Sequence, residues 1–213
     1  DKSPILECSH LGIDFGGLTA VNEFNLTIGR TEIAGLIGPN GAGKTTLLKC
    51  LLGIARPDKG TVRILDRDSR DRRAREDVGV VLDECLFHDT LLAKDVDKIL
   101  SKVYRQWDKA LLDGLLQRLK LPTNRYLKEF SRGMKMKLSL AAALAHRPQL
   151  LILDEATAGL DPVVRNEMLD LFLEFIQDEQ HSILLSSHIT SDLEKVADYI
   201  VFIHEGQIVF ELP

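Results

Sequence analysis

The sequence predicts an α/β fold in which a parallel sheet is interrupted by a helical insertion and preceded by a small antiparallel sheet. Short apolar runs typical of buried strands alternate with helical segments toward both ends of the chain. One such run leads through a glycine-rich turn directly into a helix-forming segment, as in a βα unit. Between residues 93 and 145 the strand signal fades and leucines recur at helical spacing, which indicates an insertion made mostly of helices.

The first part of the chain carries mainly strand signals. Apolar runs or alternating apolar positions predict strands at residues 5–8, 20–28, 33–37, 61–65 and 78–82. A helix is expected at residues 44–52, which are rich in good helix formers. The stretch 66–77 is dense in charges of both signs and is typical of a solvated loop or helix face.

The insertion and the C-terminal part follow in the same way. Within residues 93–145 the helical period is carried by Leu111, Leu112, Leu115, Leu116 and Leu119. Strands are then expected at residues 150–153, 183–186, 199–203 and 207–210. Helices are expected at residues 163–177 and 192–196. Because strands and helices alternate again here, the last third of the chain is expected to belong to the α/β core.

Composition excludes several classes of protein. The chain has 213 residues, 45% of them hydrophobic, and a net charge of −5, so it is long enough for a sizeable core and lacks the basic excess of many nucleic-acid binders. No apolar run approaches the roughly 18 residues that span a bilayer. Three cysteines lie far apart without metal-binding spacing, which favours a reducing cytoplasmic setting. Any role at a membrane is therefore expected to be exercised from outside the lipid.

The glycine-rich run before the helix at 44–52 matches the phosphate-binding pattern G-x-x-x-x-G-K-[ST]. Glycines let backbone N–H groups turn toward phosphate oxygens, and the N-terminus of the following helix favours negative charge. Lys44 is expected to bind the β- and γ-phosphates of a nucleotide, and the Thr45 hydroxyl to bind Mg²⁺, which prefers oxygen ligands. The residues expected to contact nucleotide here are Gly38, Pro39, Asn40, Gly41, Ala42, Gly43, Lys44, Thr45 and Thr46.

Two adjacent acids, Asp154 and Glu155, follow the buried run at residues 150–153. In α/β sheets ligands bind beyond the carboxyl ends of the strands, where these side chains would lie. Asp154 is expected to orient the Mg²⁺ shell, and Glu155 to accept a proton from, or position, the water that attacks the γ-phosphate. Acids at strand ends are also common helix N-caps, so the phosphate loop upstream is what favours the catalytic interpretation.

The run Phe130-Ser131-Arg132-Gly133-Met134-Lys135-Met136-Lys137 stands shortly before that strand. It is similar to the signature motif of the nucleotide-binding domains of ATP-binding cassette (ABC) transporters, which the chain resembles from Phe15 to about Glu211. The resemblance implies that Ser131 and Gly133, at a helix N-terminus, bind the γ-phosphate of an ATP held by a second subunit. Taken alone, Ser131 also fits an ordinary N-cap.

Three further positions match the family in order. Phe15 matches the aromatic residue that stacks on adenine, although a lone Phe near a strand is also typical of a core. Asp161, in Ala158-Gly159-Leu160-Asp161, resembles part of the D-loop, which meets its counterpart across the dimer. His188 matches the switch histidine that contacts the γ-phosphate, while an isolated His there also fits a structural role or a cap.

Three positions depart from the family pattern. Asp83 stands where the family usually has a Gln that ligates Mg²⁺ and senses the transmembrane partner. Because Asp is still an oxygen ligand, the resemblance places Asp83 with Thr45 and Asp154 at the metal. Arg132 replaces the usual Gly of the signature, and Ala156 stands where Pro usually follows the catalytic Glu. Similar substitutions occur in the ABC-2-type export subgroup, which the chain also resembles.

The resemblance implies a P-loop NTPase (RecA-like) core with an N-terminal antiparallel β subdomain and an inserted α-helical subdomain. The chain is identified as a single ABC ATPase domain spanning residues 1–213. Residues 1–82 and 147–213 are expected to form the nucleotide-binding core with the β subdomain, and residues 83–146 the Q-loop segment and the helical subdomain with the signature. Two copies, or one copy and a sister ATPase subunit, are expected to close head to tail over ATP and Mg²⁺.

The function implied is that of an ATP-hydrolysing subunit that powers a membrane transporter, an exporter by its subgroup. Its partners would be transmembrane permease subunits, contacted at the cytoplasmic face of the membrane through the segment from Asp83 to about Val96, and no nucleic acid is expected. One alternative is a soluble ABC-type ATPase of translation or DNA repair, although these usually carry two cassettes or a long coiled coil. Another, motivated by Asp83 and Arg132, is a regulatory subunit that binds ATP with little turnover.

Overall fold

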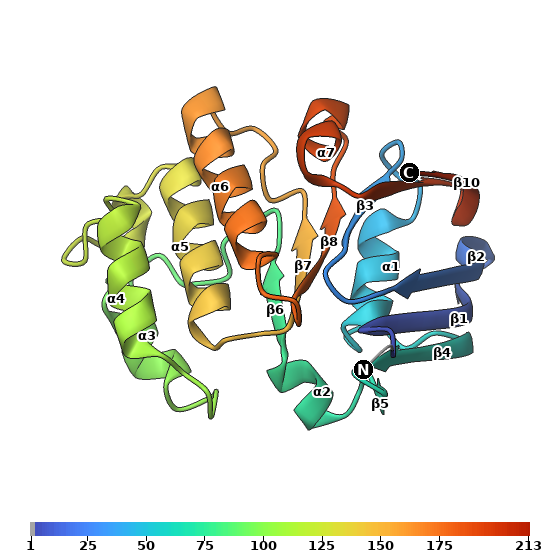
Figure 1. Cartoon of the computed structure of the whole chain (residues 1–213), viewed down its shortest axis with the longest axis horizontal. Coiled ribbons are helices and arrows are strands. Elements are labelled where there is room, and N and C mark those ends of the chain that lie inside the picture. The colour runs from blue at the N-terminus through green and yellow to red at the C-terminus, as the bar shows by residue number, and fades with distance from the viewer. Residues whose placement is uncertain (1–2) are drawn as a thin grey trace.

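The computed structural model describes residues 3–213 and shows two sheets flanked by helices (Figure 1). The strands are β1 Leu6–Phe15, β2 Leu18–Ile28, β3 Ile33–Ile37, β4 Lys59–Ile64, β5 Arg67–Asp68, β6 Val78–Val81, β7 Leu150–Asp154, β8 Ser182–Ser186, β9 Tyr199–His204 and β10 Gln207–Leu212. The helices are α1 Lys44–Leu51, α2 Arg72–Glu76, α3 Asp95–Leu100, α4 Lys109–Arg118, the 3₁₀ helix η1 Leu127–Glu129, α5 Arg132–Ala145, α6 Pro162–Phe175 and α7 Thr190–Val196.

The larger sheet is the parallel core, with strand order β10-β9-β3-β8-β7-β6. Strand β3 pairs in parallel with β8 and β9, and β7 pairs in parallel with β6 and β8. Only the edge strand β10 is antiparallel to its neighbour. The smaller sheet, β2-β1-β4-β5, is antiparallel throughout. The predicted α/β class, with a parallel core and a small antiparallel sheet, is confirmed.

Alternate residues of the central strands face two different hydrophobic cores. Leu150 and Ile152 of β7 pack with α1 and the smaller sheet, whereas Leu151 and Leu153 pack with the cluster formed by α5 and α6. Figure 1 shows α1 between the two sheets and α5 and α6 beyond the other face of the parallel sheet. A strand covered on both faces has no solvated side, which is why β7 is apolar over four consecutive residues.

Strand β1 is longer than the predicted strand at residues 5–8, since it continues to Phe15. Its register with β2 shifts between Cys8 and Leu11 and again on either side of Ile13. Such bulges break the two-residue alternation of apolar positions that identifies a strand in sequence. The extra length is functionally relevant because it carries the chain to Phe15 at the edge of the cleft described below.

The helical insertion is less regular than predicted. Helices α3 and α4 are short, and residues 101–108 and 119–125 between the helices are turns and loops. The longest helix of the insertion, α5, packs its Leu138, Leu140 and alanines into the cluster that contains Leu151 of β7. Because one core joins the insertion to the parallel sheet, the division at residues 82/83 and 146/147 stays a proposal. None of the helices in the described part of the chain combines the length and apolar character needed to cross a bilayer.

Candidate functional site

The phosphate loop occupies the carboxyl end of β3 and leads into α1. Gly43, with φ +99°, is the N-cap residue of α1 and contributes no side-chain hydrogen bond there. The first N–H groups of the helix are therefore not taken up by a capping side chain and suit an anion. Lys44 is buried, and its Nζ donates hydrogen bonds to the carbonyl oxygens of Gly38 and, at 3.1 Å, of Pro39. The ammonium group thus lies against the loop itself.

Two other segments hold this loop in place. The turn between β9 and β10 donates a hydrogen bond from the N–H of Gly206 to the carbonyl of Ala42 at 2.8 Å. The carbonyl of Gly206 accepts from the N–H of Asn22 in β2 at 2.9 Å. A Cβ at either Gly43 or Gly206 would overlap the carbonyl oxygen of Ala20. Glycine at both positions therefore allows β2, the loop and the hairpin turn to meet backbone to backbone.

Gly206→Ala is expected to lower the free energy of unfolding by about 3 kcal/mol, because a side chain at φ +74° would be strained and would displace Ala20. Gly16→Ala is the matched control, since Gly16 also has positive φ but its added Cβ would meet nothing within 4 Å. That variant is expected to lose about 1 kcal/mol. Urea unfolding measures both, and equal losses would show that the contact with Ala20 is unimportant.

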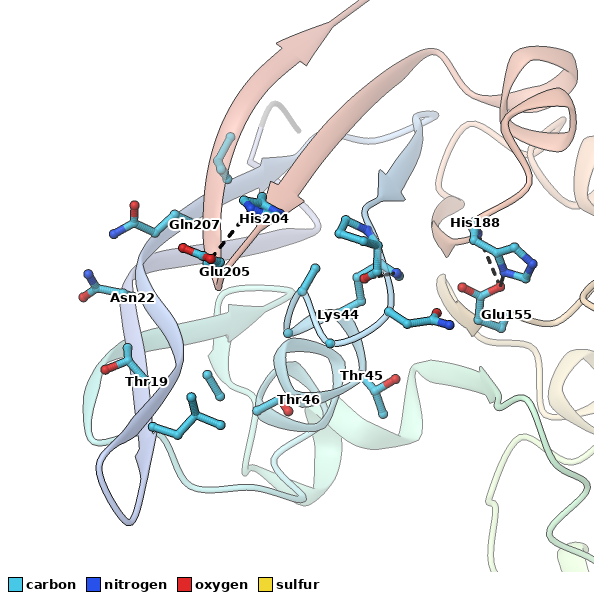
Figure 2. Close-up of a pocket in the computed structure, with 18 of the residues that line it drawn as sticks. Thr19, Asn22, Lys44, Thr45, Thr46, Glu155, His188, His204, Glu205 and Gln207 are labelled. Atoms are coloured by element: carbon cyan, nitrogen blue, oxygen red, sulfur yellow. Dashed lines mark hydrogen bonds and ion pairs between the residues drawn. The ribbon is translucent and has the colours of Figure 1, made fainter.

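A cleft of about 1200 Å³ opens over the loop. Residues predicted for the site line much of it, namely Phe15, Pro39, Asn40, Gly41, Ala42, Gly43, Lys44, Thr45, Thr46, Asp83, Glu155 and His188. Figure 2 shows Lys44, Thr45 and Thr46 at the centre, with Glu155 and His188 on one side. Phe15 is 54% exposed, so it lies on the surface of this cleft and not in a core. The cleft is large and polar enough for a nucleoside triphosphate.

Asp154 lies beneath the cleft, where its Oδ2 accepts a hydrogen bond from the Thr45 hydroxyl at 3.1 Å. Its other oxygen, Oδ1, is buried without a hydrogen-bond partner. Burial raises the pKa of this carboxyl, the hydroxyl groups of Thr45 and Ser186 oppose the rise, and the charges of Asp83 and Glu155 add to it. A cation here would offset the cost of burying this carboxylate, so the residues fit a hard metal ion.

The metal ligands available from the protein are few. Among the described residues, no three His, Cys, Asp or Glu side chains are grouped so that they hold a metal ion. Mg²⁺ is usually bound in nucleotide sites through one or two protein oxygens, with phosphate and water completing the shell. Thr45 and Asp154 provide oxygens of this kind, and Asp83 lines the same cleft.

Glu155 and His188 form a hydrogen-bonded pair at the rim of the cleft. His188 Nδ1 lies 2.7 Å from Glu155 Oε2 (Figure 2). The Glu155 side chain is only 18% exposed, whereas that of His188 is 56% exposed. Glu155 has φ +51°, a left-handed conformation that is costly for a residue with a side chain and that clusters at functional sites.

Three of the predicted signature and D-loop residues lie outside this chain's own cleft, although their neighbours Arg132 and Ala158 line it. Ser131 is the N-cap residue of α5, and its Oγ accepts from the N–H of Met134 at 3.2 Å. Asp161 caps α6 by accepting from the N–H groups of Val163 and Val164 at 3.0 and 3.1 Å. Ser131, Gly133 and Asp161 do not line the cleft, so in one chain they cannot complete it. Ser131 therefore has the N-cap role that its sequence position allows, and its exposed place at the start of α5 also leaves it accessible to a second subunit.

Arg132 connects these two motifs within one chain. Its Nε donates to the carbonyl oxygen of Ala158 in the D-loop at 3.2 Å. Arg132 also lines the nucleotide cleft and, with Asp83, a second cavity of about 530 Å³ beside it. Asp83 and Arg132, two of the positions that depart from the family pattern, therefore line the same two cavities and carry opposite charges there.

One wall of the cleft was not predicted from the sequence. Opposite Glu155 and His188, the cleft is lined by β2 and by the β9–β10 hairpin, whose polar residues include Thr19, Asn22, His204, Glu205 and Gln207 (Figure 2). A sequence signal exists for the turn itself, because His204-Glu205-Gly206-Gln207 separates two apolar runs. Its position against the phosphate loop depends on tertiary packing.

A phosphate loop at the carboxyl end of a parallel sheet is the arrangement of P-loop nucleotide-binding domains. Comparison with known proteins narrows this class. The model of the ABC transporter family matches residues 21–158. The bacitracin transport ATP-binding protein BcrA of Bacillus licheniformis is 34% identical over 215 residues, which cover 99% of this chain and 70% of BcrA.

Two further proteins agree with this match. The lantibiotic transport ATP-binding protein SrtF of Streptococcus pyogenes is 36% identical over 209 residues, covering 97% of this chain and 90% of SrtF. A solved ATP-binding subunit of an ABC transporter has a TM-score of 0.88 at 26% identity, covering 97% of this chain and 89% of that one. The chain belongs to the ABC transporter family, as an ATP-binding subunit, which confirms the resemblance seen in the sequence.

Proposed function

We propose that this chain hydrolyses ATP as one half of a head-to-tail dimer and that hydrolysis drives transport by a membrane permease. The observation that carries the proposal is the pairing of Glu155 with His188 at 2.7 Å on the rim of the cleft that holds Lys44 and Thr45. This arrangement supports the proposal because a general base and a ligand for the terminal phosphate would lie beside the groups that would bind the rest of the triphosphate.

The phosphate loop would bind the nucleotide through its backbone N–H groups and Lys44. Phe15 at the mouth of the cleft would stack on the base, in offset contact with its ring. Thr45 and Asp154, with Asp83 nearby, would hold Mg²⁺, and the metal would supply charge neutralisation at the β- and γ-phosphates. Each of these residues lies in or directly beneath the same cleft.

Glu155 and His188 would act on the terminal phosphate. A carboxylate only accepts hydrogen bonds, so His188 Nδ1 is the donor in this pair, and with both ring nitrogens protonated Nε2 would donate to the γ-phosphate. Glu155 would take a proton from the attacking water or orient that water in line with the bond to be broken. His188 would thereby hold the carboxylate and the phosphate in a fixed relation.

The proposed dimer is supported by the position of the signature and D-loop residues in one chain. Ser131 and Gly133 at the start of α5, and Asp161 before α6, are exposed or half-buried away from the cleft of their own chain. An N-terminus of a helix attracts phosphate, so this face of α5 is suited to cap the γ-phosphate of an ATP bound by a second copy or by a sister subunit. Loss of the γ-phosphate would then weaken the dimer.

A mixing experiment tests the composite site. Lys44→Ala would inactivate the phosphate loop and leave the signature intact, and Gly133→Asp would place a repelling carboxylate at the signature and leave the loop intact. Each variant alone is expected to be inactive. An equimolar mixture is expected to regain ATPase activity, up to about half of the wild-type value, because each mixed dimer has one intact site of two. No recovery on mixing, with wild-type turnover independent of protein concentration, would contradict the dimer.

The proposed partner is a transmembrane permease, contacted through the segment from Asp83 to about Val96 at the cytoplasmic side of the membrane. Leu86 in this segment is 76% exposed and lies beside a mostly apolar cavity of about 220 Å³. The names of BcrA and SrtF, which concern bacitracin and lantibiotic transport, support an exporter of peptide antibiotics as the type of system. Transport of such peptides by cells that contain this chain, its Lys44→Ala variant or neither tests this assignment.

A further inference from the structure

Behind the pair formed by Glu155 and His188 lies a second, fully buried pair of polar side chains. Thr157 Oγ1 donates a hydrogen bond to Asp192 Oδ2 at 2.8 Å, and both residues are only 1% exposed. Arg165 of α6 places its Nε 3.9 Å from the other carboxylate oxygen of Asp192, Oδ1, which has no hydrogen-bond partner. None of these three residues lines the nucleotide cleft.

The two pairs join the same two segments of chain. Thr157 follows Glu155 by two residues, and Asp192 follows His188 by four. Thr157 lies in the turn closed by the bond from the N–H of Ala158 to the carbonyl of Glu155, at 3.0 Å. The N–H of Asp192 likewise bonds to the carbonyl of Ile189 at 3.2 Å, in the first turn after His188. The buried pair Thr157–Asp192 therefore links the same two segments of chain as the pair Glu155–His188.

The turn at Glu155 needs such support. A side-chain-bearing residue at φ +51° persists only where the surrounding structure holds it. The N–H of Glu155 is held by the carbonyl of Ser186 in β8 at 3.0 Å, which fixes the entry to the turn. Thr157 is the next residue whose side chain bonds outside the turn, and its partner is on the helix that follows His188.

Burial of the Asp192 carboxylate in the core costs free energy, because a charged group loses its hydration there. Apolar side chains of similar size would pack there without desolvating a charge, so Asp192 is not explained by packing alone. Arg165 compensates the charge through an ion pair at 3.9 Å without a hydrogen bond, and its own side chain is 26% exposed. What Asp192 provides, and an apolar residue does not, is a directional acceptor that fixes the position of Thr157.

We propose that Thr157 and Asp192, with Arg165 compensating the charge, form a brace that keeps Glu155 and His188 in the geometry needed for hydrolysis. This inference rests on the roles proposed above for those two residues. Thr157 and Asp192 are positioning residues, since they contact neither the cleft nor a ligand in it. The brace also reaches the D-loop, because the neighbouring residue Ala158 accepts the hydrogen bond from Arg132.

The test separates turnover from nucleotide binding. Thr157→Val keeps the size of the side chain and removes the hydroxyl, so we expect kcat to fall by about 10-fold to 100-fold, the effect of a small misplacement of catalytic groups. The dissociation constant for a fluorescent ATP analogue is expected to stay within about 3-fold, because the phosphate loop is untouched. Thr157→Ser, which restores the donor, is expected to bring kcat back to within about 3-fold of wild type.

A double variant tests whether the two side chains act as one unit. Asp192→Asn keeps an oxygen acceptor but loses the charge, and is expected to lower kcat less than Thr157→Val does. The double variant is expected to be no slower than Thr157→Val alone, since residues that act together are not additive. Arg165→Gln, at a partly exposed position, tests the brace without a change in the core and is expected to lower kcat by about 3-fold to 10-fold.

Controls distinguish the brace from fold stability and from the proposed chemistry. Thr123→Val, at an exposed position, is expected to keep wild-type kcat. If Thr157→Val lowers the unfolding temperature and kcat together and Thr157→Ser restores neither, the pair is merely structural and the brace is wrong. If Glu155→Gln abolishes turnover while Thr157→Val and Arg165→Gln keep wild-type kcat, the brace is also wrong although the proposed function stands. Wild-type turnover in Glu155→Gln would instead overturn the proposed function.

Discussion

Lys44→Ala is expected to lower kcat/KM for ATP by at least about 10³-fold, an effect comparable with the removal of a main electrostatic group from an active site. Lys44 is only 7% exposed, and its ammonium group is held by the carbonyls of Gly38 and Pro39 at the carboxyl end of β3. Because it is already desolvated and oriented, it would meet the triphosphate with little reorganisation. Its loss would leave the β- and γ-phosphates without the only lysine among the described residues that line the cleft.

The measurement for Lys44→Ala combines titration of a fluorescent ATP analogue with steady-state ATP hydrolysis. Lys49→Ala on the same helix is the matched control, since Lys49 is exposed and does not line the cleft. Lys44→Arg adds a second comparison, because a planar guanidinium is not interchangeable with a compact ammonium at a crowded loop. Wild-type binding and turnover in Lys44→Ala would mean that nucleotide is not bound at residues 38–45, and the proposed function would fall with it.

The parts of the fold that were predicted are those in which local pattern and burial agree. The runs that became β3, β7 and β8 are covered on both faces, so their apolar character is continuous and easily recognised. Strand β5 and helix α2 lie within the charged stretch 66–77 and are mostly exposed, so no apolar pattern indicates them. The length of β1 was hidden by its bulges, which depend on pairing with β2 and β4.

In the candidate site, too, the features encoded by a local sequence pattern were predicted and those that depend on tertiary packing were not. The phosphate loop and the pair Asp154-Glu155 are each encoded in a few consecutive residues at the end of a strand, so the sequence shows them directly. The opposite wall at Asn22 and Gln207 depends on where a hairpin packs against the loop, and no short motif records that. Asp192 is a further example, since an acid in the first turn of a helix is usually a solvated one, whereas here it is buried.

Glu155→Gln is expected to reduce turnover by at least about 10²-fold while ATP binding is preserved, because the amide keeps an oxygen for the hydrogen bond from His188 but is no longer a base. The γ-phosphate would then persist between the two chains. An ATP-dependent dimer is therefore expected to accumulate, and light scattering with and without ATP and Mg²⁺ measures it. The Lys44→Ala variant is expected to remain monomeric under the same conditions, because it cannot hold the nucleotide that joins the chains.

Glu194→Gln is the matched control for this charge change, since Glu194 is an exposed acid on α7, the helix that follows His188. It is expected to hydrolyse ATP at the wild-type rate and to show no stable dimer. A Glu155→Gln protein that binds ATP but stays monomeric would separate the two halves of the proposed mechanism. Glu155 would keep its role as the base, but closure of the dimer would require the permease to bring the two chains together. This is expected if binding of the permease at the segment beginning at Asp83 supplies part of the free energy of association.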